Sequence, residues 1–274
     1  MYYEEVIAIK LSSLHARRNY SQTFQNDQFL MHTHGDHEIY CFLEGKARYT
    51  VEGNIYPLEK GDILLMRKGE AHFLMPESDG PYERIIVNFD FANSENEYVT
   101  KKLLSIFNDR PLGKFNRYPA ELFKDTNWLY YLEKMCNSSD DNQKLIYLTV
   151  LLEELYENFE TVKNDIHDSE SNSSKNVIKY INRHLTEELS LDRICERFYI
   201  SKSQLNRNFK KTNGSTVWEY ITAKRLLLAK EYLQKGEKPT SVYQKCGFQD
   251  YVTFYKAYKK YFSSSPKSDC IANS

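Results

Sequence analysis

The C-terminal part of the chain contains the same helical pattern twice, on either side of a stretch that is long enough for one continuous helix. The first copy reads SLDRICERFYISKSQLNRNFKK and the second reads SVYQKCGFQDYVTFYKAYKKYF. In both copies apolar residues recur at helical spacing on either side of a short turn. The connecting stretch, TVWEYITAKRLLLAKEYLQK, offers about 20 residues of helix, a length of about 30 Å. We therefore expect an all-helical module with two helix-turn-helix units joined by a long helix.

Three helix starts are marked by hydroxyl residues. Ser190 precedes the apolar pattern of LDRICERF. Ser201 is followed by Gln204, and Thr216 by Glu219, three residues later. These two pairs have the spacing of capping boxes, in which the two side chains bind the unpaired amides at a helix start.

Each predicted unit has an apolar face that would form its core. The inner residues are Leu191, Ile194, Cys195, Phe198, Ile200, Leu205 and Phe209 in the first unit, and Val242, Cys246, Phe248, Phe254 and Tyr258 in the second. The outer side of the second helix then carries Lys202, Ser203, Asn206, Arg207 and Lys210 in the first unit, and Tyr251, Thr253, Tyr255, Lys256, Lys259 and Lys260 in the second. Amide, hydroxyl and basic groups suit base edges and phosphates, so these helices have the character of DNA recognition helices.

The distribution of charge supports a polyanionic partner for the C-terminal half alone. Residues 1–171 contain 18 basic and 29 acidic residues, a net charge of −11, whereas residues 172–274 contain 19 and 9, a net charge of +10. A helix of about 30 Å also nearly matches one turn of B-DNA, about 34 Å. Two recognition helices could thus enter successive major grooves. The alternatives are a chance partition of charge and a helical bundle with solvated lysines.

Several spaced motifs coincide in this region: SLDRICERF, ISKSQLNRNFKKTNG, WEYITAKRLLLAKEYL, GFQDYVTFYKAYKKYF and the pair Ser265–Pro266. Together they resemble the DNA-binding module of the AraC/XylS family of bacterial transcription regulators. The resemblance implies base contacts from Ser203, Asn206 and Arg207 and from Tyr251, Val252, Tyr255 and Lys256, with Lys210 and Lys259 on the DNA backbone.

The second copy departs from the family pattern at three places. Tyr243 stands where the family has a small alanine, Pro239 replaces an aliphatic residue, and SPKSDC replaces the usual ending. We therefore expect the first recognition helix to carry most of the base reading, and the second to contribute mainly electrostatic binding.

From about residue 28 to 91, short β-type runs alternate with turn signals. The runs are HEIYCFLEG, KARYTVEG, NIYPLEKGD, ILLMRKGEAHFLM and ERIIVNFDF, separated by glycines and prolines. The pattern predicts an all-β unit that closes as a small barrel or jelly roll. The fold class is therefore α+β with two domains, a β-barrel with flanking helices followed by the all-helical module.

Histidines gather directly before the first of these runs and within the fourth. His32, His34 and Glu38 form an HxHxxxE pattern in HTHGDHE, and His72 follows in GDILLMRKGEAH. Strand alternation places His32 and His34 on one face, so the four side chains could form a site for Fe, Mn, Ni or Zn.

This text resembles both motifs of the cupin barrel, although Arg67 replaces a common proline and the final asparagine is absent. The sensor domain of the AraC family is cupin-like, so the resemblance implies that these four residues bind a small effector, with no catalytic residue, metal or cofactor. A metal-dependent cupin enzyme, an oxygenase or isomerase, is the alternative function. Hydrogen bonding at the barrel mouth is the structural alternative.

Between about 95 and 160 the period changes to that of helices. Leu148, Leu151, Leu152, Leu155 and Phe159 form one apolar stripe, which either covers the barrel or pairs helices across a homodimer. The stretch NDIHDSESNSS is too polar for a core. We therefore expect a sensing and dimerisation domain at 1–163, a linker at 164–174 and a DNA-binding domain at 175–274.

The remaining expectations concern the setting of the protein. No apolar run could span a membrane, the start MYYEEVIAIK lacks export signals, and the five cysteines form no metal or disulfide pattern. We expect a cytoplasmic activator that is not an enzyme. The expected partners are double-stranded DNA, a small effector and a second copy of the chain. The family resemblance implies activation as the output, with RNA polymerase as a further partner, and a carbohydrate as the leading effector. The pair Arg17–Arg18 is interpreted as solvated charge in an N-terminal arm.

Overall fold

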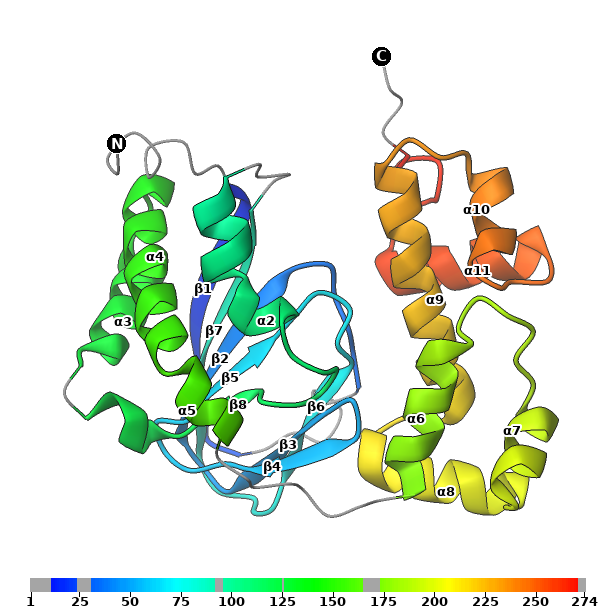
Figure 1. Cartoon of the computed structure of the whole chain (residues 1–274), viewed down its shortest axis with the longest axis horizontal. Helices are drawn as coiled ribbons and strands as arrows, with labels where there is room; N and C mark the ends of the chain where they lie inside the picture. Colours follow the sequence, from blue (N-terminus) through cyan, green and yellow to red (C-terminus); the bar gives the residue numbers. More distant parts are fainter. Residues whose placement is uncertain (1–10, 24–30, 92–95, 125, 165–172, 271–274) are drawn as a thin grey trace. The chain divides into compact units, whose positions relative to one another are not determined.

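A computed structural model of the chain describes residues 11–23, 31–91, 96–124, 126–164 and 173–270 (Figure 1). It divides into two compact units. The first comprises residues 1–29, 36–70 and 74–169, and the second comprises 30–35, 71–73 and 170–274. The predicted linker at 164–174 lies mostly outside the described residues, and the first helix after it, α6 (Ser173–Arg183), begins two residues before the predicted DNA-binding domain. The three predicted domain boundaries stay predictions.

The N-terminal part is built on two antiparallel sheets. One has the strand order β1-β7-β2-β5-β8 and the other β4-β3-β6. The strands are β1 (Leu11–Ser21), β2 (His37–Glu44), β3 (Ala47–Val51), β4 (Asn54–Pro57), β5 (Ile63–Met66), β6 (His72–Pro76), β7 (Tyr82–Phe91) and β8 (Arg117–Tyr118). The predicted sheet-rich domain is therefore present.

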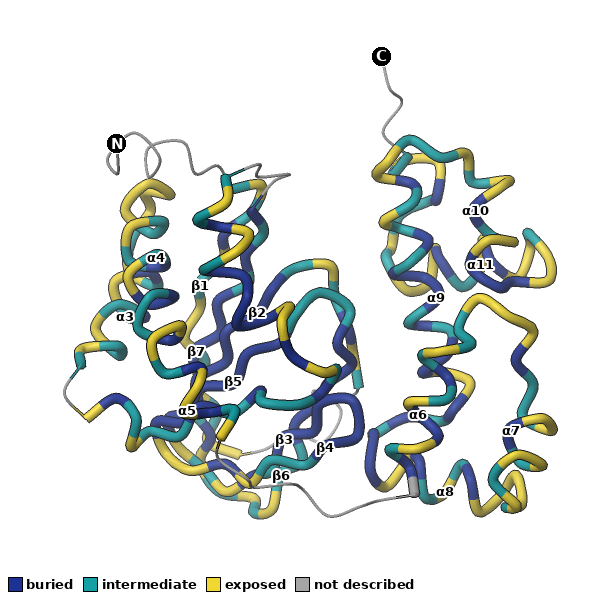
Figure 2. Tube along the Cα trace, in the orientation of Figure 1, coloured by how far each residue is buried: buried dark blue, intermediate teal, exposed yellow. Residues whose placement is uncertain are grey.

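Both faces of the five-stranded sheet are buried, because strand alternation sends neighbouring side chains to opposite sides. Tyr40 and Phe42 of β2 join a cluster with side chains of β3 and β6 from the other sheet. Ile39 and Cys41 of β2 point the other way, into a larger cluster with the helices. The arrangement is therefore three layers, two sheets and a layer of helices, with the buried positions dark in Figure 2.

The helical layer consists mainly of α3 (Trp128–Asn137) and α4 (Asp141–Glu157). The shorter helical segments are a π-helical turn (Tyr98–Leu103), α2 (Ser105–Asn108), a 3₁₀ turn (Ala120–Phe123) and α5 (Phe159–Asn164). All five residues of the predicted apolar stripe, Leu148 to Phe159, are buried in the cluster with β2 and β7. The stripe was predicted either to cover the barrel or to pair helices across a homodimer. It covers the sheet, so a dimer contact of these helices would have to use other residues.

Two N-terminal predictions are wrong. Arg17 and Arg18 lie on strand β1, which pairs along its length with β7, and Arg18 forms ion pairs with Glu83 and Glu133 at 2.7 and 2.8 Å. They are therefore part of the sheet rather than of an arm, whereas their predicted exposure to solvent is confirmed. The run ILLMRKGEAHFLM is two strands, because the backbone turns where the Glu70 amide donates to the Arg67 carbonyl at 3.1 Å.

A buried ion pair holds this turn in place. The Arg110 guanidinium donates to both carboxylate oxygens of Glu70, at 2.8 and 2.7 Å, and the Gly113 amide donates to the same carboxylate at 2.8 Å. These contacts lower the pKa of Glu70 although burial opposes that shift. The loop 109–117 is thereby bound to the turn between β5 and β6.

The C-terminal part is helical throughout its described residues. After α6 come α7 (Leu191–Phe198), α8 (Lys202–Asn213), α9 (Val217–Gln234), α10 (Pro239–Lys245) and α11 (Tyr251–Phe262). The first half of α9 packs with α6, α7 and α8, and its second half packs with α10 and α11. The two predicted helix-turn-helix units and their connecting helix are confirmed. None of the helices in the described part of the chain is long and apolar enough to cross a membrane.

Candidate nucleic-acid interface and effector site

The start of α8 is built by its cap. The Gln204 backbone amide donates to the Ser201 hydroxyl at 3.2 Å, which is one half of the capping box predicted for this pair, and the Ser190 hydroxyl caps α7 in the same way. The full reciprocal capping box forms at Thr216 and Glu219, where α9 begins. In the turn before α8, Tyr199 has a φ of 53°, a left-handed backbone in which a non-glycine residue is strained.

The exposed side of α8 is polar. Leu205 and Phe209 are buried, whereas Ser203, Arg207 and Lys210 are exposed at i, i+4 and i+7, which is one face of the helix. This face offers a hydroxyl, a guanidinium and an ammonium group, which can donate hydrogen bonds to base edges and phosphates.

Asn206 differs from the other predicted contacts of α8. It is half-buried, and its side-chain oxygen accepts a hydrogen bond from the Val217 amide at 3.3 Å. That bond satisfies an amide at the start of α9. Asn206 therefore holds α8 against α9, while its NH₂ group keeps two donors for other partners.

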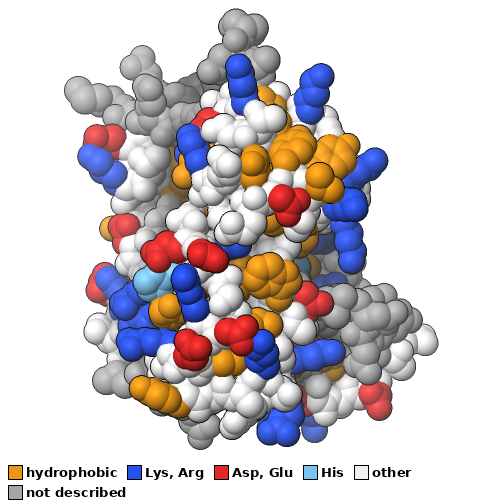
Figure 3. All heavy atoms as spheres, turned by 90° about the vertical axis from the view of Figure 1, so that its right-hand side faces the viewer, with side chains coloured by type: hydrophobic (Ala, Val, Ile, Leu, Met, Phe, Trp, Pro, Cys, Tyr) orange, Lys and Arg blue, Asp and Glu red, His pale blue; other side chains and the backbone are white. Residues whose placement is uncertain are grey.

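The exposed side of α11 is more apolar. Asp250 caps the helix by accepting from the Thr253 amide at 2.7 Å, and this bond lowers the pKa of the Asp250 carboxyl. Val252 is 60% exposed and Tyr255 37%. The lysines of this face are also exposed, Lys256, Lys259 and Lys260. Figure 3 shows basic, acidic and hydrophobic side chains intermingled on the face that it presents.

The unusual residues of the second unit have local structural roles. Pro239 occupies the first turn of α10, where a proline removes no helical hydrogen bond. The ring of Tyr243 lies 5.7 Å from that of Tyr251, centroid to centroid. Tyr251 is half-buried and also packs 5.9 Å from Phe254. Of the predicted α11 contacts, Tyr251 is thus engaged in packing, whereas Val252, Tyr255, Lys256 and Lys259 are not buried.

The two helix-turn-helix units are connected through Arg225 of α9, which is only 4% exposed. Its guanidinium donates to the carbonyls of Leu185 and Glu187, both at 2.8 Å, in the segment before α7. It also lies against Gly247 of the second unit, where an added Cβ would come within 2.8 Å of its Cζ. Arg225 therefore fills the space between the two units and leaves room only for glycine at 247.

Three of the four predicted effector residues come together. The rings of His32 and His72 have centroids 4.4 Å apart, those of His34 and His72 5.0 Å, and those of His32 and His34 6.1 Å. His32 and His72 are joined by two backbone hydrogen bonds, of 3.1 and 3.0 Å. His72 is buried, His34 half-buried and His32 exposed.

Glu38 does not join the three histidines. It lies on β2 with 3% exposure, and its carboxylate accepts from the Asn88 amide at 2.9 Å. The Glu38 carboxylate also lies beside the Tyr49 phenol. Burial, and then the charge of Glu38, raise the pKa of this phenol well above its usual value. Nearby on the same face, the hydroxyls of Tyr40 and Tyr82 lie 2.7 Å apart. Glu38 thus belongs to a buried polar group between the sheets.

Comparison with known families matches both parts of the chain. Residues 16–96 match the family described as AraC-like ligand binding domain, and residues 194–268 match the family described as helix-turn-helix domain. The chain belongs to the AraC family of transcription regulators. It is therefore a DNA-binding transcription regulator with an N-terminal ligand-binding domain.

Relatives of this regulator match over most of its length. The Msm operon regulatory protein of Streptococcus mutans is 26% identical over 83% of this chain and 81% of its own. The transcriptional activator RhaS of Yersinia pestis is 20% identical over 87% of this chain and 88% of its own. Both are regulators rather than enzymes.

Among solved structures, ToxT of Vibrio cholerae with a bound unsaturated fatty acid is 15% identical over 96% of this chain and 98% of its own, with a TM-score of 0.42. The DNA-binding domain of AdpA in complex with a target DNA is 24% identical over 36% of this chain and 89% of its own, with a TM-score of 0.34.

Arg225 was not among the functional residues of this regulator predicted from the sequence. The signal was available, because Ile221, Arg225 and Ala229 follow at i, i+4 and i+8 on one face of the long helix. A basic residue between apolar neighbours on such a face indicates a buried side chain with carbonyl partners. The ion pair between the Lys202 ammonium and the Asp192 carboxylate, 2.6 Å apart, was not predicted either. This contact raises the pKa of Lys202.

Proposed function

We propose that this regulator is a sequence-specific activator that responds to a small carbohydrate and binds paired DNA sites as a homodimer. The observation that carries the proposal is the pair of capped helices, α8 and α11, each with an exposed face that can reach DNA. Helix α9 has 18 residues and is therefore about 27 Å long, close to the 34 Å repeat of B-DNA.

The proposed base contacts are Ser203, Asn206 and Arg207 of α8 and Tyr251, Val252, Tyr255 and Lys256 of α11, with Lys210 and Lys259 on phosphates. The exposure of Ser203, Arg207 and Lys210 supports this assignment for α8. The packing of Tyr251 leaves Val252 and Tyr255 as the main apolar contacts of α11. Such groups can contact the methyl group of thymine.

The proposed effector is a carbohydrate. The names of two relatives support activation of an operon as the output, since one regulates the Msm operon and the other is the transcriptional activator RhaS. The buried group between the sheets supports the carbohydrate chemically. Glu38, Tyr40 and Tyr82, with Asn88, combine a carboxylate, hydroxyls and an amide with aromatic rings. These groups can bind sugar hydroxyls and sugar faces.

The proposed dimer surface lies on the outer side of α3 and α4. Tyr130, Ile146, Val150 and Tyr156 are large apolar side chains with exposures between 37% and 61%. Their helices cover the sheet with the opposite face, so this side remains for a second copy. Activation would then require contact with RNA polymerase, and the regulator would act in the cytoplasm.

Genome-wide mapping of bound DNA tests the proposal most directly. We expect a small number of sites, each with two similar half-sites upstream of genes for sugar uptake or breakdown. A reporter driven by such a site should respond to one sugar. Binding spread evenly over the genome would contradict sequence specificity, and sites without any carbohydrate genes would contradict the effector class.

A further inference from the structure

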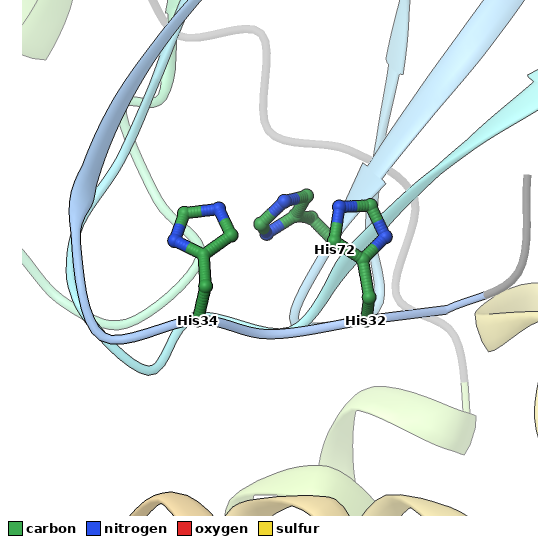
Figure 4. A group of neighbouring side chains, drawn as sticks. All are labelled: His32, His34 and His72. Carbon is green, nitrogen blue, oxygen red and sulfur yellow. The ribbon is translucent and has the colours of Figure 1, made fainter. Parts of the chain in front are cut away.

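The three clustered histidines have the geometry of a ligand set. Figure 4 shows the side chains of His32 and His34 rising from one segment, with the ring of His72 reaching in between them from its neighbour. One ring nitrogen from each residue can be chosen so that all three lie within 4.8 Å of one another. A zinc ion bonds histidine nitrogen at about 2.0–2.1 Å, so three tetrahedral ligands would lie about 3.4 Å apart. Rotation of the imidazole rings would have to bring the three nitrogens from their observed separation to the one that a bound ion requires.

Local structure holds these rings in place. His32 and His34 are two residues apart in extended chain, so their side chains leave the backbone on the same side. The two backbone hydrogen bonds between His32 and His72 fix the position of the third side chain relative to the first. A site that is largely formed before binding requires little ordering of its ligands.

The donor set selects the kind of ion. All three donors are imidazole nitrogens, and the carboxylate of the HxHxxxE pattern, Glu38, accepts a hydrogen bond from the Asn88 side chain instead. Imidazole suits Zn, Ni, Cu and Fe, whereas Mg and Ca prefer oxygen. The graded burial, from buried His72 to exposed His32, leaves one side of the cluster accessible to an ion from solvent.

We propose that His32, His34 and His72 bind one divalent transition-metal ion, with zinc as the reference ion, and that this ion modulates DNA binding. The segments that carry the three histidines, 30–35 and 71–73, form one compact unit with residues 170–274, which contain the helix-turn-helix units. The regulatory part of the proposal rests on this grouping and on the function proposed above. Three protein ligands leave a fourth coordination position for water or for a donor atom of a small molecule. Glu38 and the tyrosines between the sheets remain a separate group, so metal and organic effector have different sites.

Cobalt titration of the full-length protein tests the binding site. Co²⁺ replaces Zn²⁺ and has a strong visible absorption when it is tetrahedral. We expect one ion per chain, and binding weakened at least about tenfold by His34→Gln and by His32→Gln. His34 is half-buried and His32 is exposed, so the fold should tolerate both changes. Circular dichroism checks that it does.

His15→Gln is the matched control, because His15 is exposed on strand β1 and lies outside the cluster. It should bind cobalt like the unchanged protein. Absence of a stoichiometric ion overturns the site, and so does binding that is unaffected by His32→Gln and His34→Gln or weakened equally by His15→Gln.

DNA binding with and without zinc tests the regulatory part separately. We expect the affinity of the full-length protein for its own DNA site to change at least about fivefold when the ion binds, which is a coupling of about 1 kcal/mol. His34→Gln should abolish the change and keep the DNA affinity of the metal-free protein. An ion bound at the cluster with no effect on DNA affinity overturns the regulatory role alone. A protein that binds zinc but no DNA in either state overturns the proposed function and supports only the site.

Discussion

The two helix-turn-helix units share a scaffold and differ on their exposed faces. In both, a side-chain oxygen caps the recognition helix, Ser201 for α8 and Asp250 for α11. Both helices bury an apolar pair at i and i+4. The exposed face of α8 is polar and basic, whereas that of α11 combines Val252 and Tyr255 with lysines. The same fold can therefore read DNA in two ways, through hydrogen bonds on α8 and through apolar and phosphate contacts on α11.

Binding of both recognition helices to DNA depends on Arg225, because it fixes the distance between the two helix-turn-helix units. We expect Arg225→Met to lower the free energy of unfolding of the helical module by about 3 kcal/mol, since two buried carbonyls lose charged donors. DNA affinity should fall by about a hundredfold or more, because two units without a defined spacing cannot bind both grooves together. Urea denaturation and fluorescence anisotropy measure the two effects. Lys235→Met, at the exposed end of α9, is the control and should change neither.

Arg207→Ala and Lys256→Ala compare the two recognition helices directly. We expect Arg207→Ala to weaken binding about 10- to 100-fold and to relax the preference at one base pair, since a guanidinium reads guanine through two hydrogen bonds. Lys256→Ala should weaken binding less and relax base preference less, because we expect α11 to contribute mainly electrostatic binding. Binding to a library of site variants measures both. Equal loss of base preference in the two variants would show that the helices do not differ in their mode of reading.

The salt dependence of binding should separate phosphate contacts from base contacts. Lys210 and Lys259 occupy corresponding exposed positions in the second half of α8 and α11. We expect Lys210→Ala and Lys259→Ala each to reduce the slope of log affinity against log salt by about 1, without changing base preference. Val252→Ala should leave the slope unchanged. A slope that neither lysine alters would remove both residues from the DNA backbone.

The smallest expected difference between the two recognition helices is the pH dependence of the stability that their N-terminal caps provide. The bond from the Thr253 amide lowers the pKa of Asp250 in the folded state, so the stabilisation from this cap is present above the unfolded-state pKa of about 3.9. It is lost as the pH falls through the folded-state pKa. The Ser201 hydroxyl does not titrate, and Ser201→Ala should cost about 1 kcal/mol at every pH.

Asp250→Ser isolates that effect, because it keeps a capping oxygen and removes the charge. We expect the variant to lose less thermal stability than the unchanged protein between about pH 7 and about pH 3. Melting temperatures at both pH values measure this difference. An identical pH dependence of the two proteins would mean that the Asp250 cap contributes no charge-dependent stability.

The helical module could be predicted from the sequence because its signals are local. The caps at Ser190, Ser201 and Thr216 and the buried pattern of Phe254 and Tyr258 involve residues within a few positions of one another, and all are observed. The candidate site on α8 follows from the same periodicity, since burial of Leu205 and Phe209 leaves Ser203, Arg207 and Lys210 exposed.

The sheet domain was less predictable, because its pairings join distant segments. Strand β1 carries a mixed polar pattern, and only pairing with β7, more than 60 residues later, makes it a strand. The separation of Glu38 from the histidines has the same origin. The carboxylate follows the alternation of β2 into the space between the sheets, where Asn88 and Tyr49 bind it.

The sequence by itself determined the two-domain organisation, the family, the helical units and the outward faces of the recognition helices. These properties depend on periodicity and capping, which act over one or two helical turns. The tertiary structure alone decided that Glu38 lies apart from the three histidines and that Arg225 connects the two helix-turn-helix units. Those outcomes depend on contacts between segments whose separation in the chain carries no periodic signal, so only the folded packing brings the partners together.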